Sequence, residues 1–420
     1  MLPSLTPEQI IEKTVREEWG RILASLVGGL KDFQLAEDCL QDAVVSAMGH
    51  WAKNGLPRSP AGWLITVARR NALDKLRRDQ NFATKQAEIA YLLDLENRTL
   101  DETLIDNIPD KRLEMIFTCC HPHLEKKDQV ALTLRTLGGL STEEIAGAFL
   151  DTPDAMQKRI TRAKKKISQG SIPYEIPVQS ELMDRVTSVL SVIYLVFNEG
   201  YSATKGDSLH RNDLTQEAIR LARILASLLP EHAETAGLLA LMLLHDSRRQ
   251  ARTNKEGNLI PLEAQNRKRW NQDKIVEGVA ILEGVLPRNE LGPYQLQAAI
   301  SGTHAQSVSW EQTDWDEIST LYELLYVHHP SPVVRINQAV AASYAHSPEV
   351  ALDMLKELRA SPKVKDYQPY HAALGDVLAR VGDFHQASTC YQRAAELSDN
   401  AKEKAFLNNK STQAHLASDG

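Results

Sequence analysis

Residues 140–166 contain the signals for two short helices with a corner between them, and they read Leu-Ser-Thr-Glu-Glu-Ile-Ala-Gly-Ala-Phe-Leu-Asp-Thr-Pro-Asp-Ala-Met-Gln-Lys-Arg-Ile-Thr-Arg-Ala-Lys-Lys-Lys. Ser141 and Glu144 have the spacing of a capping box, in which each side chain bonds the backbone N–H of the other residue. Thr152 is a good cap for the second helix, and Pro153 fits its first position, where no N–H is needed. The stretch therefore predicts a helix-turn-helix.

The second of these helices carries one apolar stripe and several basic residues on its other faces. Met156, Ile160, Ala163 and Ile167 recur at helical spacing. The helix has one acid, Asp154, and six cations, namely Lys158, Arg159, Arg162, Lys164, Lys165 and Lys166. This pattern is typical of a recognition helix in duplex DNA, because phosphates attract the cations and base edges contact the early residues. The alternative is a solvated basic face on an ordinary helical hairpin.

The composition indicates a soluble globular protein of two or three domains. The chain has 420 residues, of which 43% are apolar and 25% charged. No apolar run approaches the ~20 residues of a membrane span, and no secretory pattern opens the sequence. Four cysteines do not make a disulfide framework, so we expect a reduced, cytoplasmic protein without a membrane span.

The net charge of −7 is distributed unevenly along the chain. Residues 1–170 hold 24 basic and 24 acidic side chains, whereas residues 171–420 hold 24 basic and 31 acidic ones. Residues 66–80 and 152–170 are locally basic, and the segment 86–110 between them has seven acids and one base. Two basic patches separated by an acidic segment suggest two contacts with nucleic acid and a linker that avoids it.

The first 80 residues predict a bundle of three amphipathic helices. We expect helices over 7–30, 33–51 and about 62–80, with a loop at 52–60 that is rich in Asn, Gly and Pro. The apolar residues of the second helix are expected inward, namely Leu35, Leu40, Val44, Ala47 and Met48. Glu37, Asp38, Gln41 and Asp42 are expected outward. The third helix carries basic residues beside its apolar face, which on the simplest interpretation only make the bundle soluble.

Two segments of this bundle resemble region 2 of bacterial extracytoplasmic-function (ECF) sigma factors. They are Ala-Glu-Asp-Cys-Leu-Gln-Asp-Ala at 36–43 and Trp-Leu-Ile-Thr-Val-Ala-Arg-Arg-Asn-Ala-Leu-Asp-Lys-Leu-Arg-Arg at 63–78. The helix-turn-helix is similar to region 4 of the same factors, and the order of the motifs also agrees. The resemblance covers residues 1–170 and implies a sigma factor of RNA polymerase.

The resemblance implies roles for particular residues. The acidic face of the second helix would bind core RNA polymerase through Asp38, Gln41 and Asp42. The third helix would bind the melted −10 element of promoter DNA through Arg69, Arg70, Asn71, Arg77 and Arg78. The helix after Pro153 would bind the −35 element through Gln157, Lys158, Arg159, Thr161, Arg162 and Lys165. Trp63 either packs in the bundle or touches a base, and packing is the simpler expectation.

Two further segments of the first 170 residues have open interpretations. The acidic linker, 81–110, follows the path toward the RNA exit in related factors; otherwise it is a disordered tether. Cys119-Cys120-His121-Pro122-His123 places four potential zinc ligands within five residues. Adjacent cysteines do not easily serve one tetrahedral site, so we expect a packed cysteine pair and no metal.

The rest of the chain predicts a further α-helical domain. After a boundary at 168–180 we expect helices throughout 181–420, one of them at 263–286 and the last at 399–409. From Leu374 the spacing of Gly375, Gly382, Ala387 and Tyr391 resembles a tetratricopeptide repeat. The whole chain resembles sigma factors that carry a large tetratricopeptide-like extension. The predicted fold is therefore all-α, with domains at 1–80, 111–170 and 181–420, the first two of which are joined by the acidic linker, 81–110.

The sequence thus favours a sigma factor that recognises −10 and −35 promoter elements and directs transcription initiation, tuned by its extension. Its expected partners are core RNA polymerase, promoter DNA and a protein that binds the extension. The alternative is a DNA-binding transcriptional regulator that uses the helical repeats as a scaffold. No nucleophile–base spacing or phosphate loop supports an enzyme, and we expect no catalytic residue and no cofactor.

Overall fold

The structure is a computed structural model that describes residues 6–78, 111–149, 151–201, 212–254, 258–398 and 400–418. Helices make up most of these residues, and no strand occurs among them, although Thr253 and Leu259 form an isolated antiparallel bridge. The all-α prediction is therefore confirmed. The chain forms two compact units, Met1–Leu195 and Val196–Gly420. The expected linker at 81–110 lies outside the described residues.

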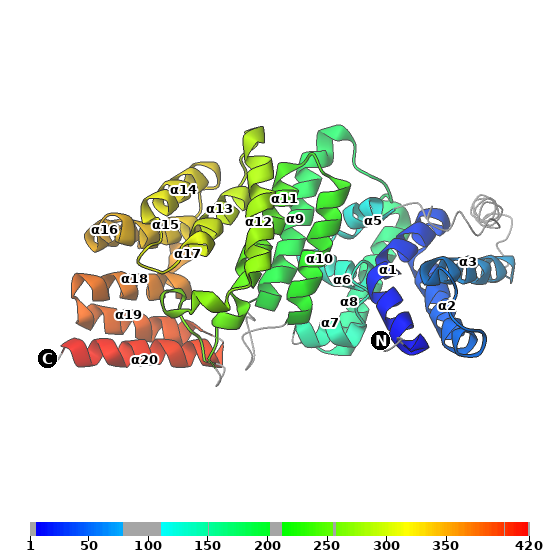
Figure 1. The fold of residues 1–420 in the computed structure, drawn as a ribbon, viewed down its shortest axis with the longest axis horizontal. Helices are drawn as coiled ribbons and strands as arrows, with labels where there is room; N and C mark the ends of the chain where they lie inside the picture. The colour runs from blue at the N-terminus through cyan, green and yellow to red at the C-terminus, as the bar shows by residue number, and fades with distance from the viewer. Residues whose placement is uncertain are drawn as a thin grey trace. The chain divides into compact units, whose positions relative to one another are not determined.

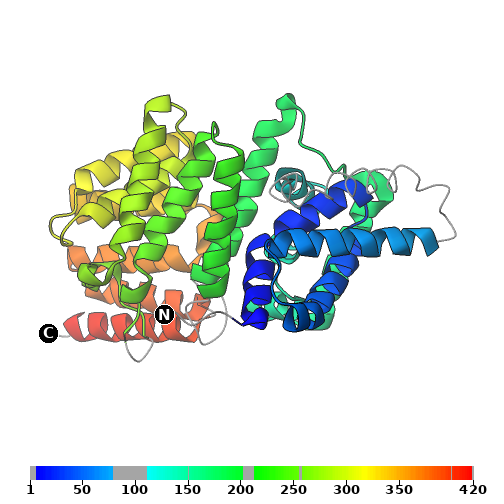
Figure 2. The same ribbon diagram turned by 45° about the vertical axis from the view of Figure 1, so that its right-hand side comes forward.

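The first three helices form a bundle, drawn in blue in Figures 1 and 2. They are α1 (Pro7–Leu30), α2 (Phe33–Asn54) and α3 (Pro60–Arg78), so the expected loop is shorter than 52–60. Thr6 and Gln9 close a capping box at α1, and the Asp32 carboxylate caps α2. Ile22, Leu40 and Leu64 are each 1% exposed, and burying a side chain of this size stabilises the bundle by about 1.5–3 kcal/mol.

Four shorter helices build the second part of the first unit. They are α5 (Arg112–Cys119), α6 (Lys126–Thr136), α7 (Thr142–Ala148) and α8 (Pro153–Lys166), followed by a π-helical turn at Ile167–Ser171. Their core holds Met115, Phe117 and Leu132, each fully buried. α6 packs on both α7 and α8, as expected for a helix that braces a helix-turn-helix.

α1 also packs against this second part of the first unit. A Cβ atom on Gly20 of α1 would lie 2.8 Å from the backbone oxygen of Leu137, so the two backbones approach as closely as only glycine permits. The Tyr174 hydroxyl donates to the carbonyl oxygen of Ala24 at 2.8 Å. The bundle and the helix-turn-helix part are therefore in contact.

Helix α9 (Gln179–Tyr201) crosses the boundary between the units. The second unit continues with α10 (Asn212–Leu228), α11 (Ala233–Ser247), α12 (Gln272–Val285) and α13 (Pro293–Gln306). Every residue from 238 to 244 of α11 is buried, because α10, α12 and α13 all pack on this helix. Its apolar sequence, which has no polar face, predicts this central position.

The expected helix at 263–286 is wrong at its start. Residues Leu262–Ala264 and Arg267–Arg269 form 3-10 turns, and α12 begins only after Asn271, whose side chain accepts the Lys274 N–H at 3.0 Å. The Arg267 guanidinium donates to the carbonyl oxygen of Ser307 at 2.8 Å. This tertiary hydrogen bond favours the turn over a continuous helix.

Seven helices complete the second unit. They are α14 (Trp315–His328), α15 (Pro332–Ala345), α16 (Pro348–Leu358), α17 (Pro362–Lys365), α18 (Gln368–Val381), α19 (Phe384–Leu397) and α20 (Ala401–Ser418). Figure 1 shows α18, α19 and α20 side by side, and α19 packs on both neighbours. The last helix is longer than the expected 399–409.

Gly375 permits the close packing of α18 on α19. A Cβ atom at this position would lie 2.8 Å from the Tyr391 ring, and the Tyr391 hydroxyl donates to Asp376 at 2.6 Å. The sequence pattern predicted this pairing of a small residue with an aromatic ring, although the assignment to tetratricopeptide repeats stays a prediction.

Across the described ranges, no helix has both the length and the apolar character that a membrane span requires.

Candidate nucleic-acid interface

The helix-turn-helix forms through the caps that the sequence predicts. The Ser141 hydroxyl accepts the Glu144 N–H at 3.1 Å, and the Ser141 N–H donates to the Glu144 carboxylate at 2.7 Å. At the start of α8 the Thr152 hydroxyl accepts the Ala155 N–H at 3.2 Å. These caps satisfy backbone groups that the first turns leave without helical partners, so they fix where both helices begin.

α8 buries its apolar stripe and presents its cations outward. Met156, Ile160 and Ala163 are buried, at 3% exposure or less. The exposed residues of the predicted DNA-binding set on this helix are Gln157, Lys158, Thr161, Arg162 and Lys165, whereas Arg159 is half-buried and pairs with Asp151 at 3.3 Å. Five polar side chains thus share one accessible surface of α8.

Intramolecular contacts orient two residues of this surface. The Thr142 hydroxyl of α7 donates to the Gln157 side-chain oxygen at 3.0 Å, which links the two helices of the motif. The Arg162 guanidinium lies 3.8 Å from the Asp128 carboxylate; Arg162 is 63% exposed and Asp128 only 2%. Lys158 and Asp154 form a solvent-exposed ion pair, which stabilises the helix by about 0.3–0.5 kcal/mol.

A second surface lies on α2, where the three residues predicted to bind polymerase share one face. Gln41 and Asp42 are exposed, and Asp38 is partly exposed. Asp38 accepts the Gln34 side-chain N–H at 2.8 Å, and Asp42 pairs with Lys75 of α3 at 2.8 Å. The arrangement leaves these acids at the surface.

The same face of α2 continues into two exposed apolar residues that the sequence pattern did not reveal. Val45 is 67% exposed and Met48 is 54% exposed. Met48 was expected inward, and this expectation is wrong because Ala43, Ala47 and Trp51 form the buried stripe. Met48 follows Asp38 by ten residues, close to three helical turns, and this spacing could have placed it on the acidic face.

The predicted DNA-binding residues of α3 divide into two groups. Arg70, Arg77 and Arg78 are exposed, and Asn71 is half-buried, 3.5 Å from the Cys39 carbonyl oxygen. Arg69 is only 4% exposed, so its guanidinium does not lie at the surface of the bundle. The accessible cations of α3 are therefore concentrated toward its C-terminal end.

Trp63 packs against aromatic rings of α2. Its ring centroid lies 5.5 Å from that of Trp51, in edge-to-face geometry, and 5.3 Å from that of His50. These contacts favour packing, the simpler of the two roles expected for this residue.

A buried ionic cluster connects α2 to the helix-turn-helix part. The Glu37 carboxylate pairs with Arg135 of α6 and with Lys164 of α8, and the exposed fractions of the three side chains are 4%, 16% and 11%. Glu37 was expected outward, and this expectation is wrong because two partly exposed cations neutralise its carboxylate in a buried position. Through Lys164, this cluster fixes the recognition helix against α2.

The cysteine pair before α6 is part of the packed core. The Cys119 thiol lies 3.2 Å from the Thr136 hydroxyl, and the Cys120 thiol lies 3.6 Å from the Thr133 hydroxyl. Burial raises the pKa of Cys120 to about 11, so the thiol stays protonated at neutral pH. Within the described ranges, no group of three or more His, Cys, Asp or Glu side chains is placed to hold a metal ion.

Three segments of the chain match known protein families. Residues 18–82 match Sigma-70 region 2, residues 114–167 match Sigma-70, region 4, and residues 185–286 match a family of unknown function, DUF6596. Over most of its length the chain is similar to the uncharacterized protein R00370 of Rhizobium meliloti (strain 1021). The two are 40% identical over 390 residues, which cover 92% of this chain and 91% of that protein. No solved structure matches the chain.

Proposed function

Because this chain belongs to one family with the Rhizobium meliloti protein R00370 and carries Sigma-70 regions 2 and 4, we propose that it directs RNA polymerase to −10 and −35 promoter elements. The two regions imply a sigma factor that directs promoter recognition, which is a non-enzymatic role. The observation that carries the finer proposal is the capped recognition helix α8, with its apolar stripe buried and its polar side chains at the surface.

At the −35 element, α8 lies in the major groove. Gln157 and Arg162 have the side-chain chemistry that reads base edges, since an amide pairs with adenine and a guanidinium with guanine. Lys158 and Lys165 contact phosphates and orient the helix without adding sequence preference. The Thr142 bond to Gln157 reduces the rotamer freedom that this residue loses on binding.

At the −10 element, the end of α3 binds the melted strand. Arg70, Arg77 and Arg78 supply cations for its phosphates, and Asn71 supplies donors and an acceptor for an unstacked base. Arg69 contributes from the surface only after a local rearrangement, because it is buried in the free bundle.

Core polymerase binds the face of α2. Val45 and Met48 form the apolar centre of this contact, and Asp38, Gln41 and Asp42 form its polar edge. Interfaces combine an apolar centre with a polar rim in this way, and methionine adapts to the shape of a partner.

The contact between regions 2 and 4 means that the chain opens when it binds a promoter. The two elements lie about 25 base pairs apart, which is about 85 Å along B-DNA at ~3.4 Å per base pair. A compact unit of about 195 residues has a radius of gyration of only about 16 Å. The free chain is therefore expected to bind promoter DNA weakly, and core polymerase stabilises the open form.

The extension, residues 181–420, tunes this activity in cis or through a partner. Support comes from α9, whose first half contacts region 4. The Arg185 guanidinium donates to the Phe117 carbonyl oxygen at 2.7 Å, and the Lys126 ammonium donates to Ser191 at 2.8 Å. A truncation at residue 175 would also remove these contacts, so it should be compared with a truncation after Tyr201.

In vitro transcription tests the proposal. The full-length chain with core polymerase and promoter DNA should give a specific run-off product, and the chain alone should not. A protein that shifts DNA without core and never yields a product would instead be the DNA-binding regulator with a scaffold domain.

Replacement of Arg162 tests the −35 assignment. If the Arg162 side chain reads a base, Arg162→Ala should weaken promoter binding by about 1–3 kcal/mol. Transcription from the cognate promoter should then fall roughly 5- to 150-fold. Lys127→Ala, an exposed cation of α6, is the matched control. An equal loss on all −35 sequences would reduce Arg162 to a phosphate contact. Thermal melts must accompany the assay, because the variant removes the cation beside the buried Asp128 carboxylate.

A further inference from the structure

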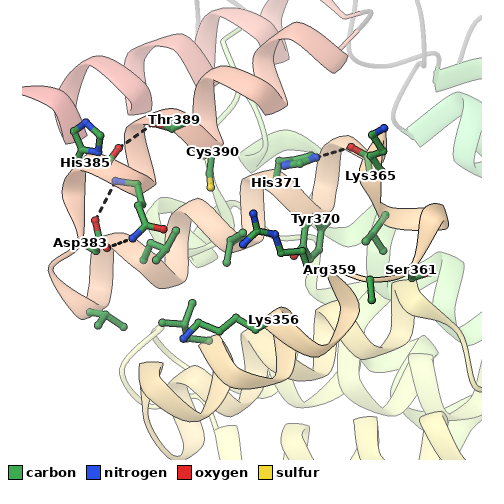
Figure 3. A pocket seen from close by; sticks show the side chains of 17 residues that line it. Lys356, Arg359, Ser361, Lys365, Tyr370, His371, Asp383, His385, Thr389 and Cys390 are labelled. Atoms are coloured by element: carbon green, nitrogen blue, oxygen red, sulfur yellow. Dashed lines mark hydrogen bonds between the residues drawn. The ribbon is translucent and has the colours of Figure 1, made fainter.

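A pocket opens in the second unit between helices α16, α17, α18 and α19, far along the chain from the sigma regions. Its volume is about 700 Å³, within the range of ligand-binding clefts. Figure 3 shows side chains from all four helices turned toward it. The apolar part of the lining includes Leu352, Val364, Leu374 and Leu378.

The polar part of the lining is mainly cationic. Lys356 lies on α16, Arg359 directly follows that helix, and Lys365 ends α17; all three side chains are exposed. His371 and His385 extend the polar lining at the starts of α18 and α19. The labelled side chains in Figure 3 are spread around the opening rather than gathered at one point.

The single carboxylate among the lining residues is already engaged. Asp383 caps α19, where its carboxylate accepts the Gln386 N–H at 3.0 Å and the side-chain amide of Gln386 at 2.5 Å. Two carboxylates that neighbour these cations in sequence pair elsewhere, Glu357 with Arg335 and Asp366 with Arg393. Lys356 has only a loose, exposed contact with Asp353 at 3.6 Å. The pocket therefore presents positive charge.

This positive charge stands out against the domain around it. Residues 171–420 hold 31 acidic and 24 basic side chains, so the average surface of this part repels anions. A cationic pocket in such a surface selects anionic ligands and favours their encounter.

We propose that this pocket binds an acidic segment of a partner protein, with an apolar side chain on its floor and carboxylates at Lys356, Arg359 and Lys365. A chain of several carboxylates fits better than a single small anion, because the three cations come from different points of the rim. A peptide fits better than nucleic acid, because the aliphatic floor offers aliphatic and aromatic side chains a site that phosphates cannot use.

Peptide binding to the full-length chain tests the proposal without polymerase or promoter. The probe is a fluorescent 12-residue peptide that combines Glu and Asp with two Leu and one Phe, and its binding is followed by anisotropy. One control peptide carries Gln and Asn in place of the acids, and another carries Ser in place of the apolar residues. We expect saturable binding of the first peptide and at least tenfold weaker binding of both controls.

Charge reversal locates the binding. Arg359→Glu after α16 and Lys365→Glu at the end of α17 should each weaken the peptide complex about tenfold or more. Lys268→Glu reverses an exposed cation of the same unit away from the pocket and should leave it unchanged. Circular dichroism verifies the fold of each variant. Equal affinity of the Arg359, Lys365 and Lys268 variants would overturn the proposal.

Cys390 provides a second readout in the unmodified chain. It lines the pocket and is partly exposed, whereas Cys39, Cys119 and Cys120 are buried. Bound peptide should slow its alkylation by iodoacetamide at least several-fold, as measured by mass spectrometry. An unchanged alkylation rate at saturating peptide would place the peptide elsewhere and refute the site. If a single-stranded oligonucleotide protects Cys390 and the acidic peptide does not, the peptide assignment is wrong.

Discussion

Substitution of Glu37 by Gln should release region 4 from region 2. Glu37 is 4% exposed between Arg135 and Lys164, and the variant removes its charge with almost no change in shape. Removing one partner of a buried ion pair costs about 3–5 kcal/mol, because the remaining charge is left uncompensated. Both cations keep more than 10% exposure and can reach water, so we take the lower limit.

A loss of about 3 kcal/mol corresponds to a roughly 150-fold shift of the closed–open equilibrium, at ~1.36 kcal/mol for each factor of ten. Energy transfer between dyes at Lys53→Cys of α2 and Ser168→Cys beyond α8, in a Cys390→Ser background, reports the separation. Both positions are exposed. We expect lower transfer efficiency in the Glu37 variant, and tighter binding of promoter DNA without core polymerase.

Asp154→Asn is the matched control, because it removes one charge from an exposed pair with Lys158 in the same region. Such a pair contributes at most about 1 kcal/mol, so transfer efficiency and DNA affinity should stay within a few-fold of the parent. The reasoning is refuted if the Glu37 and Asp154 variants behave alike.

Asp38→Lys combined with Asp42→Lys should abolish co-purification with core polymerase while the circular dichroism spectrum stays unchanged; an unfolded double variant would make these acids structural. Gly375→Ala should lower the free energy of unfolding by about 1–3 kcal/mol, because the new Cβ meets the hydrogen-bonded Tyr391 ring at 2.8 Å. The control is Gly284→Ala on α12, where a Cβ would have no atom within 4 Å, and it should be neutral or stabilising by up to ~1 kcal/mol. Similar melting temperatures of the two variants would contradict the argument. Burial and neighbouring arginines lower the pKa of His304 to about 3, below the ordinary value of 6.5, so the unfolded chain takes up this proton first as the pH falls. The contribution of neutral His304 to stability is complete above pH 6.5 and should decline below it by up to ~1.4 kcal/mol per pH unit. Urea titrations should show a smaller decline in His304→Asn.

Local chemistry explains which features could be predicted from the sequence. Ser141, Glu144 and Thr152 act on backbone groups three residues away, so their spacing alone is enough to place the helix-turn-helix. The outward cations of α8 followed from the periodicity of its apolar stripe. The all-α class followed from the same periodicity repeated along the chain.

The remaining features depend on contacts between distant residues. Glu37 lies 127 positions from Lys164, and nothing in the sequence around it distinguishes it from the partly exposed Asp38. The burial of Arg69 depends on how α3 packs, because helical periodicity does not show how much of the basic face the neighbouring helices cover. Asn271 is the cap that starts α12, and recognising it would have excluded Arg267–Arg269 from that helix.

Helix α9 has a consequence for the order in which the parts of the protein fold. It begins in the first unit and ends in the second, without a break at Leu195. Starting a helix is costly, whereas adding a residue to an existing one is favourable. Since N-terminal parts fold first during synthesis, the first half of α9 is ordered on region 4 before the rest of the extension leaves the ribosome. The finished sigma regions thus serve as the template on which the next domain starts to fold.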